Sequence, residues 1–204
     1  NKVNNVQQLH IDYDNNGGVS LGNIVAKNDA GQYVYNATKI NAVAYITDTG
    51  SNGSMPPPNI SMNEQKIGYT PFLMTDSISE DGVVVRYKYG FGYSRVKSVK
   101  SVNGSITETR YYFGSFERQI KGSINRYIHY LHNGRQLYAI AVKTGSTPVK
   151  IYYTYTDYLG SILAVTDSMG TVIARQNFDP WGRHRNATNW SYSNISSVPD
   201  WLYR

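Results

Sequence analysis

The chain has 204 residues, of which 40% are hydrophobic and only 17% are charged, and its formal net charge at pH 7 is +6. Its nineteen tyrosines, with abundant Gly, Asn, Ser and Thr, are typical of strands and tight turns and exclude a disordered chain. The sequence has no Cys and no run of eighteen apolar residues, which excludes a disulfide framework, a Cys-based metal site and a membrane-spanning helix.

The positive charge is scattered along the chain. The densest basic cluster is Arg183-His184-Arg185, and no longer run of Lys or Arg occurs. Nucleic acids attract concentrated basic patches, so we expect no nucleic-acid partner. The first residues, Asn1 to Asn5, include no initiator Met and do not form a signal peptide. We therefore expect an excised piece of a longer protein, with any export signal upstream.

Four segments are expected in chain order. Residues 1–46 are predicted to form hairpins. Residues 47–63 contain three consecutive prolines among Gly, Ser and Asn, which predicts an irregular loop. Hairpins are expected again in residues 64–185, up to a boundary with a different core. Residues 186–204 form an Asn/Ser-rich tail that ends in a partial apolar segment, which we expect to be truncated.

X-Gly pairs mark the turns between the hairpins. Asn-Gly and Asp-Gly favour two-residue turns, because both central positions require a positive φ. The pairs are Asn16-Gly17, Ala30-Gly31, Asp81-Gly82, Asn103-Gly104, Lys121-Gly122, Asn133-Gly134 and Met169-Gly170. Runs rich in Tyr, Val and Ile lie between them, as in strands. These runs predict strands at residues 83–89, 107–113, 125–131, 136–143, 149–155 and 171–178. Residues 158–166 are also expected to be mostly strand, since a Gly stands in what would be the first helical turn.

One pattern recurs in degenerate form: a Tyr-x-Tyr strand, then Asp, then a Gly turn. Its clearest copy contains Tyr155, Asp157, Gly160, Asp167 and Gly170. A repeat of about twenty residues indicates an array of similar units that bury an apolar face by stacking. Both rings of a Tyr-x-Tyr pair project from one face of a strand. We therefore predict an all-β fold of consecutive antiparallel hairpins in one twisted, curled sheet, stabilised mainly by a tyrosine-lined face.

These blocks resemble the YD-repeat (Rhs) family, specifically the repeats that lead into its associated core. The blocks that carry the resemblance are Tyr13-Asp14, Gly22-Asn23-Ile24, residues 87–90, 111–118, 128–130 and 156–162, and Phe178-Asp179-Pro180-Trp181-Gly182-Arg183. The resemblance implies a large secreted or cell-surface bacterial protein, in many members a polymorphic toxin. The repeats of such a protein form a shell around a C-terminal effector. The remainder of the same polypeptide would then be the partner of this segment.

The resemblance also implies an aspartic self-protease in the core that follows the repeats. The chain ends at Tyr203-Arg204, about where that core begins in the family, and it carries no effector domain. Position 158 is Tyr where the family often has His. The sequence therefore predicts a non-catalytic structural segment, not an enzyme, without a cofactor or a bound metal.

Asp157, Asp167 and Asp179 could be read as an aspartic-protease set, in which two carboxylates share a proton. We expect them instead to be turn or strand-end residues, because each stands close to a Gly or a Pro. His129 and His132 would share a face on a helix and could bind zinc there. On a strand they point to opposite faces, so no metal site is expected.

The motif Asp179-Pro180-Trp181-Gly182 is expected to be a structural corner. Pro180 has no N–H to donate to a ladder, and Gly182 can adopt a positive φ. Asp179 can accept hydrogen bonds from nearby backbone N–H groups. Trp181 is predicted to cover the apolar face of the last hairpin, so that its replacement by Ala would cost about 3–5 kcal/mol.

The sequence suggests two possible binding functions, one for carbohydrate and one for phosphate. Exposed Tyr and Trp rings stack on sugar faces, so the alternative function is a binding module for cell-surface carbohydrate. Gly90-Phe91-Gly92-Tyr93 superficially suggests a phosphate loop. No helix is expected after it to hold a phosphate, and the sequence there predicts a bend between strands.

Overall fold

The computed structural model describes residues 10–14, 22–27, 30–47 and 64–202. It is almost all β, with 58% strand, and the described residues contain no α-helix. Within that part of the chain, no helix has the length and the apolar character needed to span a membrane. The irregular loop expected at 47–63 lies outside the described residues, except for Thr47 at the end of a strand.

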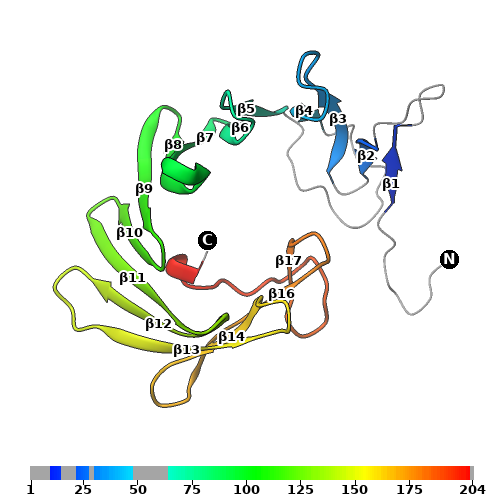
Figure 1. Cartoon of the computed structure of the whole chain (residues 1–204). Helices are drawn as coiled ribbons and strands as arrows, with labels where there is room; N and C mark the ends of the chain where they lie inside the picture. The colour runs from blue at the N-terminus through cyan, green and yellow to red at the C-terminus, as the bar shows by residue number, and fades with distance from the viewer. Residues whose placement is uncertain (1–9, 15–21, 28–29, 48–63, 203–204) are drawn as a thin grey trace. The chain divides into compact units, whose positions relative to one another are not determined.

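Fifteen strands form one antiparallel sheet, in which each strand neighbours the next along the chain (Figure 1). They are β1 (Ile11–Tyr13), β2 (Ile24–Lys27), β3 (Gly31–Tyr35), β4 (Val43–Thr47), β5 (Gln65–Tyr69), β6 (Thr75–Glu80), β7 (Val83–Tyr89), β8 (Arg95–Val102), β9 (Ser105–Phe113), β10 (Phe116–Lys121), β11 (Ile124–Asn133), β12 (Gln136–Thr144), β13 (Lys150–Thr156), β14 (Ile162–Thr166) and β15 (Val172–Arg175). A separate pair is formed by β16 (Asn177–Phe178) and β17 (His184–Arg185), and two short 3-10 turns are η1 (Phe91–Tyr93) and η2 (Asp200–Leu202). The prediction of consecutive antiparallel hairpins is confirmed.

The chain divides into two compact units, residues 1–107 and 108–204. Few described side chains of the first unit are buried, among them Ala30 and Ile46. Its last hairpins are joined by aromatic contacts: the Phe72 ring meets the Tyr89 ring edge-on, with 5.7 Å between centroids, and the Tyr93 ring at 5.0 Å. The turn from Gly90 to Tyr93 links β7 to β8, as the bend predicted from the sequence.

Two adjacent hairpin turns of the first unit have the predicted form. Asp81 and Gly82 have φ of 48° and 73°, and Asn103 and Gly104 have φ of 48° and 82°. Both central residues are thus left-handed, as in a type I′ turn. The Asn103 N–H donates to the Gly82 carbonyl at 2.8 Å, and a Cβ on Gly82 would lie 2.3 Å from the Asn103 Oδ1. The φ of Gly82 therefore favours glycine, and a Cβ there would also force the Asn103 side chain to move.

Two other X-Gly pairs are displaced by one position from the prediction. Lys121 pairs with Ile124, and Asn133 pairs with Gln136. The central turn residues are therefore 122–123 and 134–135, with the glycine first in each at a φ of 57° and 61°. A type II′ turn requires a positive φ only at its first central position. The residue before the glycine consequently stays in the strand.

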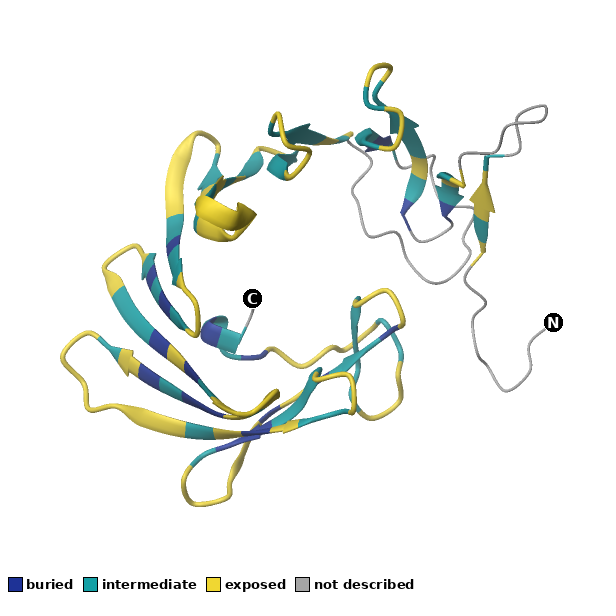
Figure 2. Ribbon diagram, in the orientation of Figure 1, coloured by how far each residue is buried: buried dark blue, intermediate teal, exposed yellow. Residues whose placement is uncertain are grey.

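The second unit contains an apolar core on one face of its sheet. Figure 2 shows buried residues recurring along the neighbouring strands β10, β11 and β12. The core consists of Ile128, Tyr130, Ile140, Val142, Val165 and Trp201. Residues opposite each other in the ladder share a face, and Ile128 pairs with Val142 while Tyr130 pairs with Ile140. We call this face, which also contacts η2, the inner face of the second unit.

The single strand predicted for residues 171–178 is wrong, because β15 and β16 are separate strands in separate sheets. The break falls at the buried Gln176. Its N–H still donates to the Leu163 carbonyl at 2.8 Å, and its side-chain Nε2 donates to the Ile162 carbonyl at 3.0 Å. Gln176 is thus still bonded to β14, but the residues that follow it form β16, which pairs with β17 and not with β14.

The prediction that a tyrosine-lined face supplies most of the stability is wrong for the second unit. Tyr155 and Tyr153 share the outer face of β13 and are 56% and 44% exposed. Tyr130 is the one buried tyrosine among the described residues, and aliphatic side chains make up most of the core around it. The alternation of side chains placed the paired rings on one face, but that face is the solvent face.

Candidate functional site

The three candidate Asp residues each begin a five-residue loop with the same hydrogen bonds. The loops are 157–161, 167–171 and 179–183. In each, the Asp N–H donates to the carbonyl four residues later, and the Asp Oδ1 accepts the N–H groups two and four residues later at 2.8 to 2.9 Å. The fourth residue of each loop is a glycine with φ between 81° and 92°, namely Gly160, Gly170 and Gly182.

The structure does not bring Asp157 and Asp167 together. They lie at the two ends of the five-residue strand β14, a separation of roughly 17 Å at about 3.4 Å per residue. The backbone hydrogen bond from Ser161 holds the pKa of Asp157 below its ordinary value, with a smaller contribution from Leu159. An ionised, backbone-bound carboxylate at a turn is not the proton-sharing acid of an aspartic protease.

Asp179 differs from the other two because it is buried and accepts a third hydrogen bond. Its Oδ2 accepts the Tyr192 hydroxyl at 2.9 Å. Burial, and then this contact with Asp179, raise the pKa of Tyr192. The Arg183 guanidinium lies over the Tyr192 ring at 4.3 Å from its centroid, which ties the loop to the following segment. Pro180 occupies the second position of the loop, between β16 and β17, where no ladder bond is needed.

The predicted burial of Trp181 is wrong. Its side chain is 50% exposed, although its backbone N–H donates to Asp179. The corner therefore depends on backbone groups and on the Asp179 carboxylate, and the ring contributes little apolar burial. His129 is exposed beside the Phe116 ring, and the His132 Nδ1 lies 3.1 Å from the Tyr130 carbonyl oxygen. Among the described residues, no group of His, Asp and Glu could hold a metal ion.

The inner face carries a buried polar cluster on β9 and β10, which the sequence did not indicate. Glu117 and Gln119 are fully buried, and Arg110 is 8% exposed. Arg110 donates from Nε to Glu108 and from Nη1 to Glu117, the latter at 3.5 Å. Gln119 donates to Glu108 at 3.0 Å and accepts a hydrogen bond from Arg126. Burial tends to raise the pKa of Glu108, but the hydrogen bonds from Arg110 and Gln119 together leave this pKa lowered.

The C-terminal turn η2 docks on this cluster. Arg110 donates from Nη2 to the Asp200 carbonyl oxygen at 3.0 Å. The Lys121 Nζ lies 2.7 Å from the Asp200 Oδ2 in an ion pair. The hydrogen bond from Lys121 lowers the pKa of Asp200 against the opposing effect of burial, and the charges of Arg126 and Arg110 add to it. One residue of the tail thus receives donors from two strands of the inner face.

The next tail residue inserts into the apolar core. Trp201 is 6% exposed, and its ring stacks on the Tyr152 ring with 4.6 Å between centroids and 30° between planes. Leu202 packs against the same cluster, together with Ile162 and Leu137. The ionic and apolar contacts lie side by side on one face, so η2 is held by both. We refer to this combination of Arg110, Lys121 and Tyr152 with their core neighbours as the tail-docking site.

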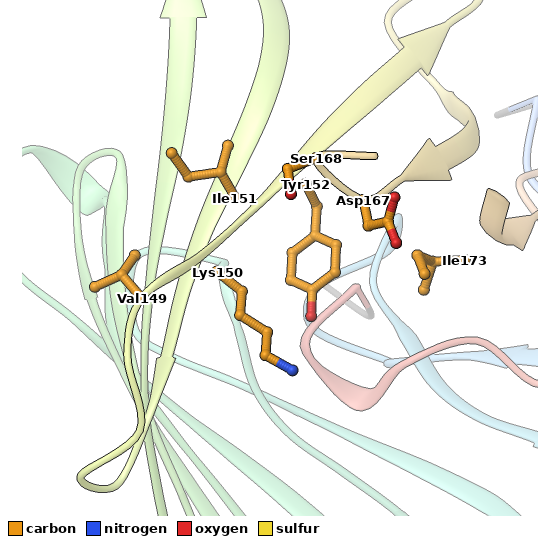
Figure 3. A pocket seen from close by; sticks show the side chains of 7 residues that line it. All are labelled: Val149, Lys150, Ile151, Tyr152, Asp167, Ser168 and Ile173. Carbon is orange, nitrogen blue, oxygen red and sulfur yellow. The ribbon is translucent and has the colours of Figure 1, made fainter. Parts of the chain in front are cut away.

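A shallow groove of about 470 Å³ lies beside Tyr152. Figure 3 shows its lining, in which Lys150, Ile151 and Tyr152 of β13 and the preceding Val149 lie opposite Asp167, Ser168 and Ile173. The Asp167 Oδ1 is occupied by backbone N–H groups of its loop. The groove therefore offers aliphatic surface with one lysine and two hydroxyl groups, and its carboxylate already accepts backbone hydrogen bonds in the Asp167 loop.

The tail-docking site could hardly be predicted from the sequence. Its tail residues stand in an Asn/Ser-rich stretch, where Val198 and Trp201 are the main apolar signals. Their partners lie far away in the sequence: Lys121 is 79 positions and Arg110 is 90 positions from Asp200. Contacts between residues so far apart leave no periodic pattern in the sequence, so a single sequence cannot predict them.

No family model matches the sequence, and no curated protein matches it. Chains of solved structures do match the fold. One is the crystal structure of TcdB2-TccC3-TEV, with a TM-score of 0.50 and 18% sequence identity over 64% of this chain. The match covers only 7% of that chain's length. At this identity the likeness concerns the fold of the matched part of the chain alone.

Proposed function

We propose that this chain is a non-catalytic structural segment of an Rhs/YD-repeat shell in a secreted or cell-surface bacterial toxin that encloses a C-terminal effector. The fifteen strands in chain order support this, because a meandering sheet forms a continuous wall without crossover connections. The likeness of the fold to part of the solved structure of TcdB2-TccC3-TEV is compatible with this proposal. On this proposal the partner of the segment is the remainder of its own polypeptide.

The docking of η2 on the inner face is the observation that carries the proposal. A wall that encloses a polypeptide needs one surface that receives the chain leaving the repeats. In the second unit that surface combines a buried polar cluster with an aliphatic core, and the outer face instead exposes its aromatic rings. The tail after β17 returns to the inner face through Asp200 and Trp201.

Electron microscopy of the complete gene product tests the shell proposal. We expect a hollow particle whose wall contains this segment, located with a Fab fragment against a tag in the exposed turn at Gly134-Arg135. A matched particle with the tag placed in the turn at Gly122-Ser123 should show the Fab at the other end of β11, about 34 Å away at about 3.4 Å per residue. A solid or extended particle would contradict the proposal.

The aspartic-protease alternative makes an opposite prediction. If Asp179 is structural, the wild-type chain and an Asp179→Asn variant should both keep their intact mass during incubation, measured by mass spectrometry. The Asn side chain keeps an oxygen that can accept the N–H groups of Trp181 and Arg183. A defined cleavage product from the wild type alone would restore the protease alternative.

A second candidate function is carbohydrate binding by the outer face of the second unit. Phe113, Phe116 and His129 are opposite one another on three adjacent strands of this face. Phe116 stacks on Tyr127 at 6.0 Å between centroids, and Phe113 is 61% exposed. Flat exposed rings of this kind can stack on sugars. A glycan array should then show binding that Phe113→Ala weakens and that Trp181→Ala, at an exposed ring elsewhere, leaves unchanged.

A further inference from the structure

The segment Val198–Leu202 contacts the inner face as a short ligand would. The five residues before it, 193–197, are all exposed and belong to no strand or helix. The residues from Val198 to Trp201 are then buried or half-buried. The segment adds no strand to the fifteen-stranded sheet, and its described contacts with the inner face are made by side chains and by one carbonyl group.

The inner face binds the adjacent residues Asp200 and Trp201 by different kinds of contact. Lys121 meets the Asp200 carboxylate at 2.7 Å, and Arg110 meets the Asp200 carbonyl oxygen at 3.0 Å. Arg110 is shared with Glu108 and Glu117 and meets a carbonyl of the tail, whereas Lys121 meets the carboxylate itself and so favours an acidic residue at this position. Asp200 and Lys121 are each 45% exposed at the side chain, and the pair therefore forms the rim of the site.

Trp201, the neighbouring residue, is bound in an apolar pocket that includes an aromatic ring. Trp201 stacks on Tyr152 and joins the cluster of Ile128, Ile140 and Val142. The other two tryptophans, Trp181 and Trp190, are 50% and 62% exposed. A buried aromatic anchor surrounded by a charged rim is the usual arrangement of a binding hot spot.

We propose that the tail-docking site is a peptide-recognition site for an acidic residue followed by an aromatic and an aliphatic residue, here Asp200-Trp201-Leu202. The tail occupies it as a reversible ligand, and covalent connection to β17 is not needed for recognition. A tethered ligand competes at an effective concentration in the millimolar range, so the site of the wild-type chain is filled by its own tail. This inference goes beyond the shell proposal, because recognition of a peptide can be measured whether or not the sheet belongs to a shell.

The first experiment uses the full chain with Trp201→Ala, in which the anchor is removed and the site is open. A fluorescein-labelled peptide with the sequence of residues 197–204 is titrated with each protein, and binding is followed by anisotropy. We expect saturable binding to Trp201→Ala and at least tenfold weaker apparent binding to the wild type, whose tail competes. Trp181→Ala is the matched control and should behave as the wild type. Absence of binding to a Trp201→Ala chain with native circular dichroism would overturn the proposal.

A charge exchange within the full chain provides a second test that needs no added peptide. Lys121→Glu or Asp200→Lys alone should release the tail and raise acrylamide quenching of the one protected tryptophan. The double variant Lys121→Glu/Asp200→Lys should restore the wild-type quenching, because the ion pair is re-formed with reversed charges. If quenching is the same in all four proteins, the rim does not select the acidic residue and the proposal fails. A concentration-dependent dimer in which the tail of one copy fills the site of another would support recognition in trans, and gel filtration detects it.

Discussion

At the scale of single residues, the tryptophans show that a residue in a recognisable motif is not necessarily a buried one. Trp181 belongs to the most specific sequence block but is half-exposed, while Trp201 stands in a polar tail and is buried. Replacing Trp201 with Ala should lower the free energy of unfolding of the second unit by about 3–5 kcal/mol, the range for a large buried aromatic. The measurement is urea unfolding followed by circular dichroism, with Trp181→Ala as the control. Equal losses for the two variants would contradict the described burial.

A second residue-scale prediction concerns Gly82. Its φ of 73° makes any other L-residue cost about 1–2 kcal/mol, and a Cβ would also meet the Asn103 Oδ1 at 2.3 Å. Gly82→Ala should therefore destabilise the first unit more than Gly104→Ala, whose Cβ would meet nothing within 4 Å. Adding Asn103→Gly to Gly82→Ala should remove the steric part of the loss. Thermal melts of the four proteins would show no such rescue if the side-chain contact is unimportant.

At the scale of elements, the repeated Asp loop is the unit that could be predicted best. The Asp-to-Gly spacing of three residues sufficed to place Asp167 in a turn, because the Asp side chain accepts local N–H groups and the glycine takes the left-handed position. A loop of the same kind forms without Asp or Gly at Thr70–Met74, where the Thr70 Oγ1 accepts the Met74 N–H and Leu73 adopts a φ of 65°. A loop is therefore easy to recognise only when its usual residues are present.

Removing the carboxylate tests how much this loop chemistry contributes. Asp179→Ala deletes three hydrogen bonds at a buried position and should cost roughly 2–4 kcal/mol. Asp167→Ala deletes two at a more exposed turn and should cost about 1 kcal/mol. Asp179→Asn should lie between the wild type and Asp179→Ala, since an amide retains one acceptor oxygen. Chemical denaturation orders the three variants, and an Asp167→Ala loss equal to that of Asp179→Ala would contradict the role of burial and of Tyr192.

At the scale of the whole molecule, the period of two in the strands predicted which side chains share a face but not which face is buried. The rings of Tyr153 and Tyr155 lie together as expected, yet the buried face is built from Ile128, Ile140 and Val165. Which face of the sheet is buried depends on which segment of the chain covers that face. In the second unit η2 is part of that cover, through Trp201, and its contacts span too much sequence to be inferred from local patterns.

The response of the molecule to pH follows from the groups whose pKa values differ between the folded and the unfolded chain. The pKa of Glu108 is lowered by hydrogen bonds from Arg110 and Gln119, and the pKa of Asp200 is lowered by Lys121. The contributions of both carboxylates to stability are therefore complete above about pH 5 and are lost as the pH falls through the lowered values. The raised pKa of Tyr192 has the opposite sign: its contribution is complete below about pH 10 and is lost as the pH rises further. Thermal midpoints measured from pH 3 to pH 11 should therefore fall at both ends.

At the acid end, exposure of Trp201 to acrylamide should accompany the loss of stability, because Asp200 holds the adjacent residue in place. An Asp200→Asn variant should show a shallower acid decline than the wild type, and a decline of unchanged slope would show that the ion pair with Lys121 does not contribute to it.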